Sequence, residues 1–293
     1  MEIIVFSGGL GNQMFQYAFY LAKKQRSFDV HINLYSIHRE GTHNGFELER
    51  LFGIKSDNSS WYVRIIRKLL IFKKKKYYKT ISNVLLKVVK LTKINIIQEK
   101  GDSHYDYDYL IPRDGRVLYF GFWQTSLYFT SLEKEIRSAF SFDRLKLSGQ
   151  SQSLSAKIQA VESVSVHIRR GDFFDKDFNN AICNKDYYIK SIDLINNKIA
   201  DAYFVFFSDE PEWVKENIPL SNAIYVDWNQ GINSWEDMCL MSKCKHNIIA
   251  NSTFSWWGAW LNENKAKIVI APSRFIKKAE TPHIYPSDWI LLN

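Results

Sequence analysis

The chain has 293 residues and carries 39 Lys and Arg against 31 Asp and Glu, for a net charge of +8. Apolar residues make up 46% and aromatic residues 15% of the sequence, which excludes a disordered or collagen-like protein because the apolar mass can offset the entropy lost on ordering. The length favours two domains or one large one. The excess of basic residues suits binding to a nucleic acid, to an acidic membrane surface or to a phosphorylated substrate. Charge alone does not distinguish among these partners.

The cysteines and the apolar runs bear on the cellular compartment. Cys183, Cys239 and Cys244 are too few and too scattered for a disulfide framework, and they lack the four-ligand spacing of a structural zinc site. The apolar run at the N-terminus is too short for a signal-peptide core, and no stretch approaches the roughly 18–20 uncharged residues that cross a bilayer. We therefore expect a cytoplasmic protein, soluble or peripheral on the inner face of the cytoplasmic membrane.

The first half of the chain opens in the manner of an α/β domain. An apolar run at residues 3–6 predicts a buried strand, and residues 7–13 predict a tight glycine loop. Residues 14–25 then repeat apolar side chains at helical spacing, so strand, loop and helix follow in the order typical of α/β folds. Further strands are predicted at residues 30–34 and 117–120.

Residues 55–100 differ in character, because they hold 13 Lys or Arg and only two acidic residues. This segment carries +11, so the rest of the chain carries −3. Residues 63–72 and 81–89 show amphipathic helical patterns on either side of Lys73, Lys74, Lys75 and Lys76. We interpret the segment as a basic helical insertion in the N-terminal domain that contacts an anionic membrane; the alternative is a solvated basic face over a small helical subdomain. Aromatic residues are too few for base stacking, so we expect no nucleic acid.

A polar stretch at residues 145–155 predicts a linker, which divides the chain into domains 1–150 and 151–293. The second domain alternates apolar runs with helical patterns such as residues 185–196 and 235–243, which favours a parallel sheet. The apolar runs are residues 164–168, 203–207, 248–250 and 268–270. Ligands of such sheets bind at the carboxyl ends of the strands.

The first candidate site follows the strand predicted at residues 164–168. Arg169 and Arg170 come directly after it, and a guanidinium at that position suits a bidentate hold on phosphate oxygens. Because successive side chains point to opposite faces, we expect only one of the two arginines to reach a ligand. The alternative is an Arg–Asp pair with Asp172 that closes a turn.

The second candidate site is Asn251-Ser-Thr253, which follows the strand predicted at residues 248–250. Small hydroxyl residues between a strand and a helix place N–H groups at a helix N-terminus, where anions bind. The alternative is an ordinary helix cap before a Trp-rich core helix. Two candidate phosphate sites in one half of the chain favour a nucleotide ligand.

The glycine loop at residues 8–13 is not a dinucleotide fingerprint, because Met14 stands where the third glycine belongs. The loop indicates a sharp bend or a close approach to a ligand, and the amides of Asn12 and Gln13 favour the ligand. Asp-x-Asp patterns, which some transferases use to hold a metal, occur at residues 106–108 and 175–177. Neither follows an apolar strand, so we expect no metal site.

Several motifs, taken in order, closely resemble those of the α1,2-fucosyltransferases of glycosyltransferase family 11, particularly the bacterial enzymes of O-antigen and surface-glycan synthesis. They are Gly8-Gly-Leu-Gly-Asn-Gln-Met-Phe-Gln-Tyr-Ala18, His167-Ile-Arg-Arg-Gly-Asp172, Phe207-Ser-Asp-Glu210 with Trp213, and Asp237 with residues 251–261. The resemblance implies a GT-B fold of two facing Rossmann-like domains with the donor in the second. It also implies inverting transfer of fucose from GDP-β-L-fucose to the 2-hydroxyl of a galactose, in an α1,2 link and without a metal or other cofactor.

The resemblance also implies residue roles. Arg169 would hold the β-phosphate and His167 would lie beside the nucleotide. Asp237, sixteen residues before Thr253, would contact guanine. The implied nucleotide-binding residues are Gly9, Gly11, Gln13, His167, Arg169, Asp237, Asn251, Ser252 and Thr253, and the implied catalytic residues are Arg169, Asp172 and Asn12. Asp172 is either the general base or a brace for an arginine, and a mechanism without a strong base is a further option. A non-catalytic GDP-binding or membrane-surface protein on the same fold remains the alternative.

Overall fold

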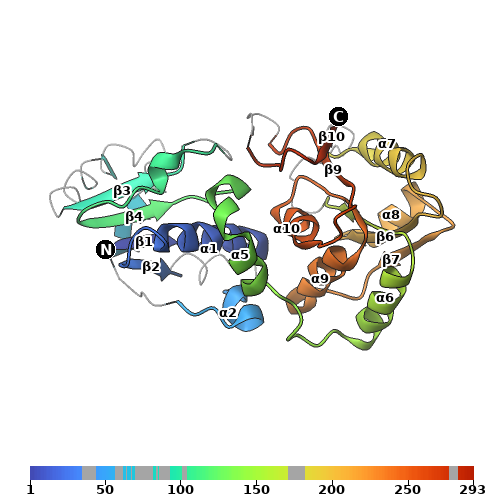
Figure 1. Ribbon diagram of the computed structural model, residues 1–293, viewed down its shortest axis with the longest axis horizontal. Helices are drawn as coiled ribbons and strands as arrows, with labels where there is room; N and C mark the ends of the chain where they lie inside the picture. Colours follow the sequence, from blue (N-terminus) through green and yellow to red (C-terminus); the bar gives the residue numbers. More distant parts are fainter. Residues whose placement is uncertain are drawn as a thin grey trace. The chain divides into compact units, whose positions relative to one another are not determined.

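The computed structural model describes residues 1–34, 44–56, 93–100, 104–170, 182–276 and 283–293, with nine single positions between 62 and 85 (Figure 1). The chain divides into two compact units, Met1–Ser141 and Phe142–Asn293, which we call unit 1 and unit 2. Each unit is built around its own parallel sheet, which confirms the predicted α/β class. Among the described residues, no helix combines the length and the apolar character needed to cross a bilayer.

The sheet of unit 1 has the strand order β2-β1-β4-β3, and every neighbouring pair is parallel. Its strands are β1 (Glu2–Val5), β2 (Val30–Asn33), β3 (Ile94–Gln98) and β4 (Arg116–Phe120). The central strand β1 is buried along its whole length, as expected for a strand covered on both faces. The helices of unit 1 that are described along their whole length are α1 (Leu10–Lys24), α2 (Glu47–Phe52) and α5 (Glu133–Ala139).

The sequence predicted a single buried face for helix α1, whereas the helix is buried on several sides. It begins at Leu10, directly after Gly9, and its buried residues occur on nearly every side, including the polar Gln13, Gln16 and Lys23. Each of these buried polar side chains has a partner in unit 1. The helix therefore works as the centre of unit 1, and its amides fix the loops around the sheet.

Lys23 lies with Glu2 at the amino edge of the sheet, the edge where the strands begin. Lys23 Nζ is 2.6 Å from Glu2 Oε1, and both side chains are buried. The Tyr119 hydroxyl donates to the same carboxylate oxygen at 2.7 Å. Burial lowers the pKa of Lys23 and raises the pKa of Tyr119. The three groups join α1, β1 and β4 through contacts within unit 1.

The basic segment at residues 55–100 contributes to the α/β core of unit 1. Residues 62, 63, 65, 66, 68 and 69 are helical, and Val63, Ile66 and Leu69 are buried in one cluster with residues of β1, β3 and β4. Strand β3 also comes from this segment. The predicted peripheral insertion is therefore wrong in these residues, because part of the apolar face assigned to a membrane packs on the sheet. Lys73, Lys74, Lys75 and Lys76 lie outside the described residues.

The sheet of unit 2 has the strand order β10-β9-β8-β5-β6-β7, again with parallel neighbours. Its strands are β5 (Ser163–Ile168), β6 (Tyr203–Ser208), β7 (Ala223–Val226), β8 (His246–Ile248), β9 (Val269–Pro272) and β10 (Ile290–Leu292). The strand predicted at residues 248–250 begins and ends earlier than expected. Its first residues, His246 and Asn247, are polar but buried.

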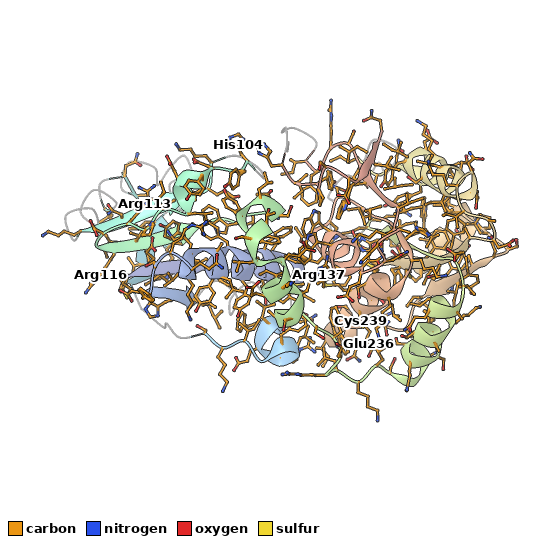
Figure 2. All side chains as sticks on the ribbon, viewed as in Figure 1. His104, Arg113, Arg116, Arg137, Glu236 and Cys239 are labelled. Carbon is orange, nitrogen blue, oxygen red and sulfur yellow. The ribbon has the colours of Figure 1, made fainter. Side chains whose placement is uncertain are left out.

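The helices of unit 2 are α6 (Gly149–Ala160), α7 (Lys185–Asn196), α8 (Pro211–Asn217), α9 (Trp235–Lys243) and α10 (Thr253–Leu261). The predicted bounds of α7 and α9 match the structure. The predicted linker is wrong, because most of it forms α6, and Ser148 caps that helix. Glu236 of α9, labelled in Figure 2, accepts from the Ser148 hydroxyl at 2.8 Å, so these polar residues are used inside unit 2.

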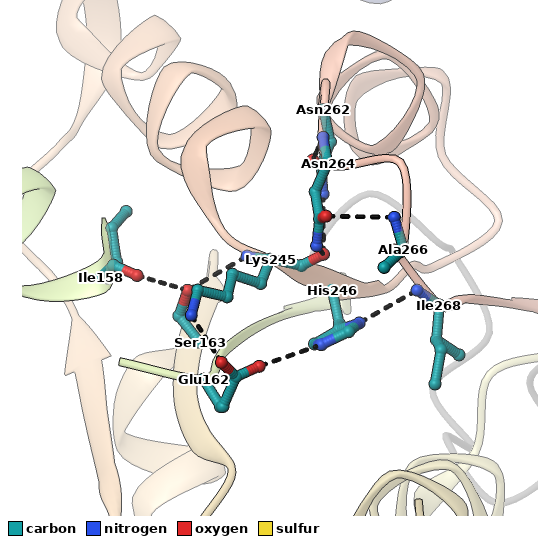
Figure 3. A network of polar contacts seen from close by, with 9 residues as sticks. All are labelled: Ile158, Glu162, Ser163, Lys245, His246, Asn262, Asn264, Ala266 and Ile268. Atoms are coloured by element: carbon teal, nitrogen blue, oxygen red, sulfur yellow. Dashed lines mark hydrogen bonds and ion pairs between the residues drawn. The ribbon is translucent and has the colours of Figure 1, made fainter. Parts of the chain in front are cut away.

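A polar network ties the amino edge of the unit 2 sheet together (Figure 3). Glu162 pairs with Lys245 at 2.5 Å and lies 3.6 Å from Nε2 of His246. The backbone N–H of Ile268 donates to Nδ1 of His246 at 3.0 Å, so this nitrogen carries no proton. Burial lowers the pKa of His246, which favours the neutral form that this bond requires.

Candidate functional site

The two phosphate-binding sites predicted in unit 2 meet in the structure. Strands β5 and β8 are parallel neighbours, with Val164 opposite His246, so both end at the carboxyl edge of the sheet. Arg169 directly follows β5, and Ser252 precedes α10. Arg169 Nη1 donates to Ser252 Oγ at 3.5 Å. An arginine and a helix N-terminus therefore lie side by side where ligands of parallel sheets bind.

Ser252 is the N-cap of α10, as the more ordinary interpretation of this sequence predicted. Its backbone is extended, and its hydroxyl accepts the backbone N–H of Phe254 at 3.3 Å. The first turn of a helix has N–H groups without intrahelical acceptors, and the helix dipole adds positive potential there. Capping and anion binding are therefore compatible, and Thr253 is the first residue of the helix.

Arg170 turns toward the other neighbour of β5. Its Nη1 is 3.1 Å from Oε2 of Glu210, which follows β6. Its guanidinium carbon lies 3.9 Å from the ring centroid of Trp213, and its backbone N–H donates to Asp209 Oδ1 at 3.0 Å. The two arginines thus contact residues that follow different neighbours of β5, Arg169 at Ser252 after β8 and Arg170 at Glu210 after β6. The acidic partner is Glu210, and Asp172 lies outside the described residues.

His167 lies within β5, two residues before Arg169. Its side chain is 9% exposed, and burial together with the charge of Arg169 lowers its pKa to about 3. The imidazole is therefore neutral at physiological pH. Its Nδ1 is buried and has no hydrogen-bond partner within the part of the chain that the structure describes. Its ring centroid is 5.9 Å from that of Phe254 in α10, which places the histidine beside the same helix N-terminus.

Two tyrosines of α7 hold the carboxyl ends of the strands. The Tyr188 hydroxyl donates to the carbonyl of His167 at 3.1 Å. The Tyr187 hydroxyl donates to the carbonyl of Ile249 at 2.7 Å and to that of Ile270 at 3.3 Å. Sequence analysis missed both residues, although a pair of tyrosines within an amphipathic helix is a usable signal for buried hydroxyls that need partners.

Asn251 uses its amide within unit 2. Its Nδ2 donates to the carbonyl of Phe275 at 3.1 Å, and its Oδ1 accepts from the Cys183 thiol at 3.4 Å. Burial raises the pKa of Cys183 to about 12, so the thiol keeps its proton. The sequence assigned Asn251 to nucleotide binding, whereas the structure shows a side chain that shapes the loop before Ser252.

Asp237 of α9 is a carboxyl in poorly hydrated surroundings. Asn229 Nδ2 donates to its Oδ1 at 2.8 Å. Burial raises the pKa of Asp237 to about 8, with a further contribution from the charge of Glu236. The side chain keeps part of its surface exposed. A largely buried carboxyl with so high a pKa can gain from N–H donors that a ligand brings, because they would stabilise the ionised form.

The glycine loop of unit 1 follows β1 at the carboxyl edge of that sheet. Gly8 has a φ of +79°, and a Cβ there would lie 2.6 Å from Asn12 Nδ2. Both the backbone conformation and the lack of space therefore favour glycine at this position. Gly9 is the N-cap of α1 without a side-chain cap bond, and Gly11 is buried in the first turn. Asn12 is half-buried, and its Oδ1 accepts from Gln124 Nε2 at 2.9 Å.

Gln13 is fully buried, unlike its neighbour Asn12. Its Nε2 donates to the carbonyls of Gly8 and Gly45, both at 2.9 Å, and its Oε1 accepts the backbone N–H of Glu47 at 3.0 Å. The sequence assigned Gln13 to ligand binding. Its amide is instead committed to the loop and to α2, so Asn12 is the residue of this pair that can face a ligand.

The Asp-x-Asp pattern at residues 106–108 does not form a metal site with other described residues. Asp106 accepts the backbone N–H of Asp108 at 3.0 Å and so caps a short helical turn. Residues 175 and 177 lie outside the described ranges. Within those ranges, no group of three or more His, Cys, Asp or Glu side chains is arranged to hold a metal ion.

A family model described as Glycosyl transferase family 11 matches residues 1–293. An alpha-1,2-colitosyltransferase of Escherichia coli is 33% identical over 302 residues and covers 99% of both chains. The O-antigen biosynthesis glycosyltransferase WbnK of Escherichia coli is 32% identical and covers 98% of both chains. Galactoside alpha-(1,2)-fucosyltransferase 1 of Saimiri boliviensis boliviensis is 26% identical over 190 residues, which are 59% of this chain and 51% of that protein.

Proposed function

The chain belongs to glycosyl transferase family 11, as its motifs predicted, and we propose that it transfers L-fucose from GDP-β-L-fucose to the 2-hydroxyl of a galactose in a bacterial surface glycan. The anomeric carbon is inverted, and the new link is α1,2. The observation that carries the proposal is the contact between Arg169 and Ser252 at the N-terminus of α10. On this proposal unit 2 binds the donor and unit 1 serves the acceptor, in a GT-B arrangement.

The chemistry of the departing nucleotide explains why these groups suit the reaction. Breaking the bond between fucose and phosphate leaves negative charge on the β-phosphate and positive character on the sugar. Arg169 and the N-terminus of α10 stabilise that negative charge, each by about 2–4 kcal/mol if they act as other preorganised donors do. This stabilisation requires no metal, so we propose a metal-independent transferase. Ser252 and Thr253 would place the helix N–H groups against the phosphate.

Asp237 suits the guanine base on this proposal. Guanine presents two adjacent kinds of N–H donor, the ring N1–H and the exocyclic amine, and an ionised carboxylate accepts both. The raised pKa of Asp237 reflects burial that removes water from the carboxyl, and guanine would supply the donors that water no longer does. Binding would then ionise Asp237 and release a proton near neutral pH.

His167 and Asn12 act by hydrogen bonding on this proposal. The low pKa of His167 excludes a positively charged imidazole at physiological pH, so its buried Nδ1 would pair with a polar group of the nucleotide. Asn12 would contact the reacting sugars from the glycine loop. A general base at Asp172 stays a prediction, as does membrane contact through Lys73, Lys74, Lys75 and Lys76.

A second donor is favoured by one specific finding, the 33% identity to a protein named alpha-1,2-colitosyltransferase. Colitose is fucose without its 3-hydroxyl, so the same phosphate and guanine contacts would serve both donors. The test is to incubate the protein with GDP-fucose or GDP-colitose and a panel of β-galactosides, and to determine the linkage by NMR. We expect an α1,2-linked product from GDP-fucose. Transfer from GDP-colitose alone would reassign the donor, and GDP binding without transfer from either would favour the non-catalytic alternative.

A further inference from the structure

The turn after β4 in unit 1, Gly121–Gln124, is held in an unusual conformation. Trp123 has a φ of +57°, a left-handed value that is uncommon for a bulky residue. Its side chain is fully buried, and its ring stacks on that of Phe19 with the centroids 4.2 Å apart. Strained backbone of this kind persists only where the surroundings determine it, and such positions cluster at functional sites.

Glu99, at the end of the neighbouring strand β3, clamps the same turn. Its carboxylate accepts the backbone N–H of Phe122 at 2.7 Å and that of Trp123 at 3.1 Å. A Cβ at Gly121 would lie 2.6 Å from the Cβ of Glu99, so the clamp also requires a glycine. The buried Trp123 ring holds this turn through its packing on Phe19, and the Glu99 carboxylate holds its backbone N–H groups. Together these contacts fix the conformation of the turn.

The turn ends at Gln124, whose side chain contacts Asn12. Gln124 Nε2 donates to Asn12 Oδ1 at 2.9 Å. The two ends of a carboxamide are similar in shape but opposite in hydrogen bonding. A donor at Gln124 therefore selects the orientation in which Asn12 Oδ1 faces the turn. Asn12 Nδ2 then lies beside Gly8, where it fills the space that a side chain would need.

We propose that Gln124 is a positioning residue for glycosyl transfer: it orients the carboxamide of Asn12 so that the amide nitrogen is offered to a substrate oxygen. This inference rests on the proposed function, in which Asn12 contacts the reacting sugars. It assigns Asn12 the role of a hydrogen-bond donor and excludes it as the group that takes the acceptor proton. Glu99 and Trp123 contribute by fixing the turn from which Gln124 acts.

The test compares two substitutions of similar size that offer Asn12 either an acceptor or no hydrogen-bonding group. Gln124→Glu replaces the donor by an acceptor and should turn the Asn12 carboxamide around, so we expect kcat to fall about 10-fold or more. Gln124→Met keeps the size of the side chain and removes the bond, so we expect a fall of about threefold. Because the proposed function places the phosphate and guanine contacts in unit 2, the KM for the GDP-sugar should stay within about twofold in both. The control is Gln25→Glu, which makes the same charge change at an exposed site in unit 1.

A double-mutant cycle separates orientation of Asn12 from a general structural effect. If Gln124 acts through Asn12, then Gln124→Glu should change kcat by less than about twofold when Asn12 is already alanine. Full additivity of the two losses would overturn the inference, and so would a Gln124→Glu enzyme with the wild-type kcat. A wild-type protein that transfers nothing would overturn the proposed function and this inference with it. An active wild type with an unaffected Gln124→Glu variant would overturn the inference alone.

Discussion

At the amino edges of the two sheets, ionised groups are paired with opposite charges, as in Lys23 with Glu2 and Lys245 with Glu162. At the carboxyl edge of unit 2, by contrast, the Asp237 carboxyl meets the neutral amide of Asn229, and the Nδ1 of His167 has no partner among the described residues. Burial raises the pKa of Asp237 and lowers the pKa of His167, and both shifts favour the neutral form of the group. The difference separates polar groups that stabilise the fold from polar groups that can gain from a ligand.

The largest expected effect is at the amino edge of unit 1. Lys23→Met should lower the free energy of unfolding by about 3–5 kcal/mol, because it leaves the buried Glu2 carboxylate without its cation. Denaturant titration measures this loss. The matched control is the neighbouring exposed Lys24→Met, which should cost less than about 1 kcal/mol. Equal losses in the two variants would contradict the structural role of the buried pair.

The next effect is at the carboxyl edge of unit 2, where activity should suffer more than stability. Arg169→Ala should lower kcat for transfer by about 10²-fold or more, because it removes a charge that stabilises the departing phosphate. The melting temperature should stay close to that of the wild type. Activity within a few-fold of wild type, measured by product formation from GDP-fucose, would refute the phosphate role.

Asp237 should make the affinity for GDP depend on pH. Its pKa is raised to about 8 in the free protein, and guanine should lower it by stabilising the ionised form, so binding releases a proton below that pH. The affinity for GDP should therefore rise between about pH 6 and pH 8, by at most about tenfold per pH unit. Calorimetric titrations across this range measure the slope. Asp237→Asn should remove this contribution, and an unchanged slope in that variant would assign the dependence to the nucleotide itself.

The smallest effect on the transfer reaction itself comes from the basic segment. Replacing Lys73, Lys74, Lys75 and Lys76 with Gln should weaken binding to anionic vesicles at low salt, by about 1 kcal/mol for each lysine that reaches the surface. Transfer to a soluble galactoside should not change. Vesicle binding equal to that of the wild type would remove the membrane prediction, whose apolar component is already reduced by the burial of Val63, Ile66 and Leu69.

The sequence predicted those elements whose evidence is local. The sequence located β1, β5 and β6 from their apolar runs and α7 and α9 from their helical patterns, because each of these signals is long or strongly periodic. The edge strands β3, β7 and β10 were missed, since they are short or only partly buried and resemble loops. The amino end of β8 was missed because Asn247 is buried through a bond to Ser165, eighty-two positions away.

The candidate site divides in the same way. Arg169 was found because it directly follows a strand, and Ser252 because it lies between a strand and a helix; both have chemistry suited to phosphate. The roles of the adjacent amides Asn12 and Gln13 could not be separated, because only the packing of α1 decides which one faces inward. Gln124 could not be assigned at all, since its partner lies 112 positions away. Ser148 and Ser151 were misinterpreted as part of a linker for the same reason: their partners Glu236 and Asn229 are distant in the sequence.

The most direct test of the account is a calorimetric titration of GDP into protein treated with EDTA, carried out with the wild type and with Arg169→Ala. We expect the wild type to bind one GDP per chain without a divalent cation, and Arg169→Ala to weaken this binding by about tenfold or more. Lys24→Met, which changes an exposed charge in unit 1, should bind GDP as the wild type does. Binding that requires a divalent cation, or equal affinities for the wild type and Arg169→Ala, would contradict the account.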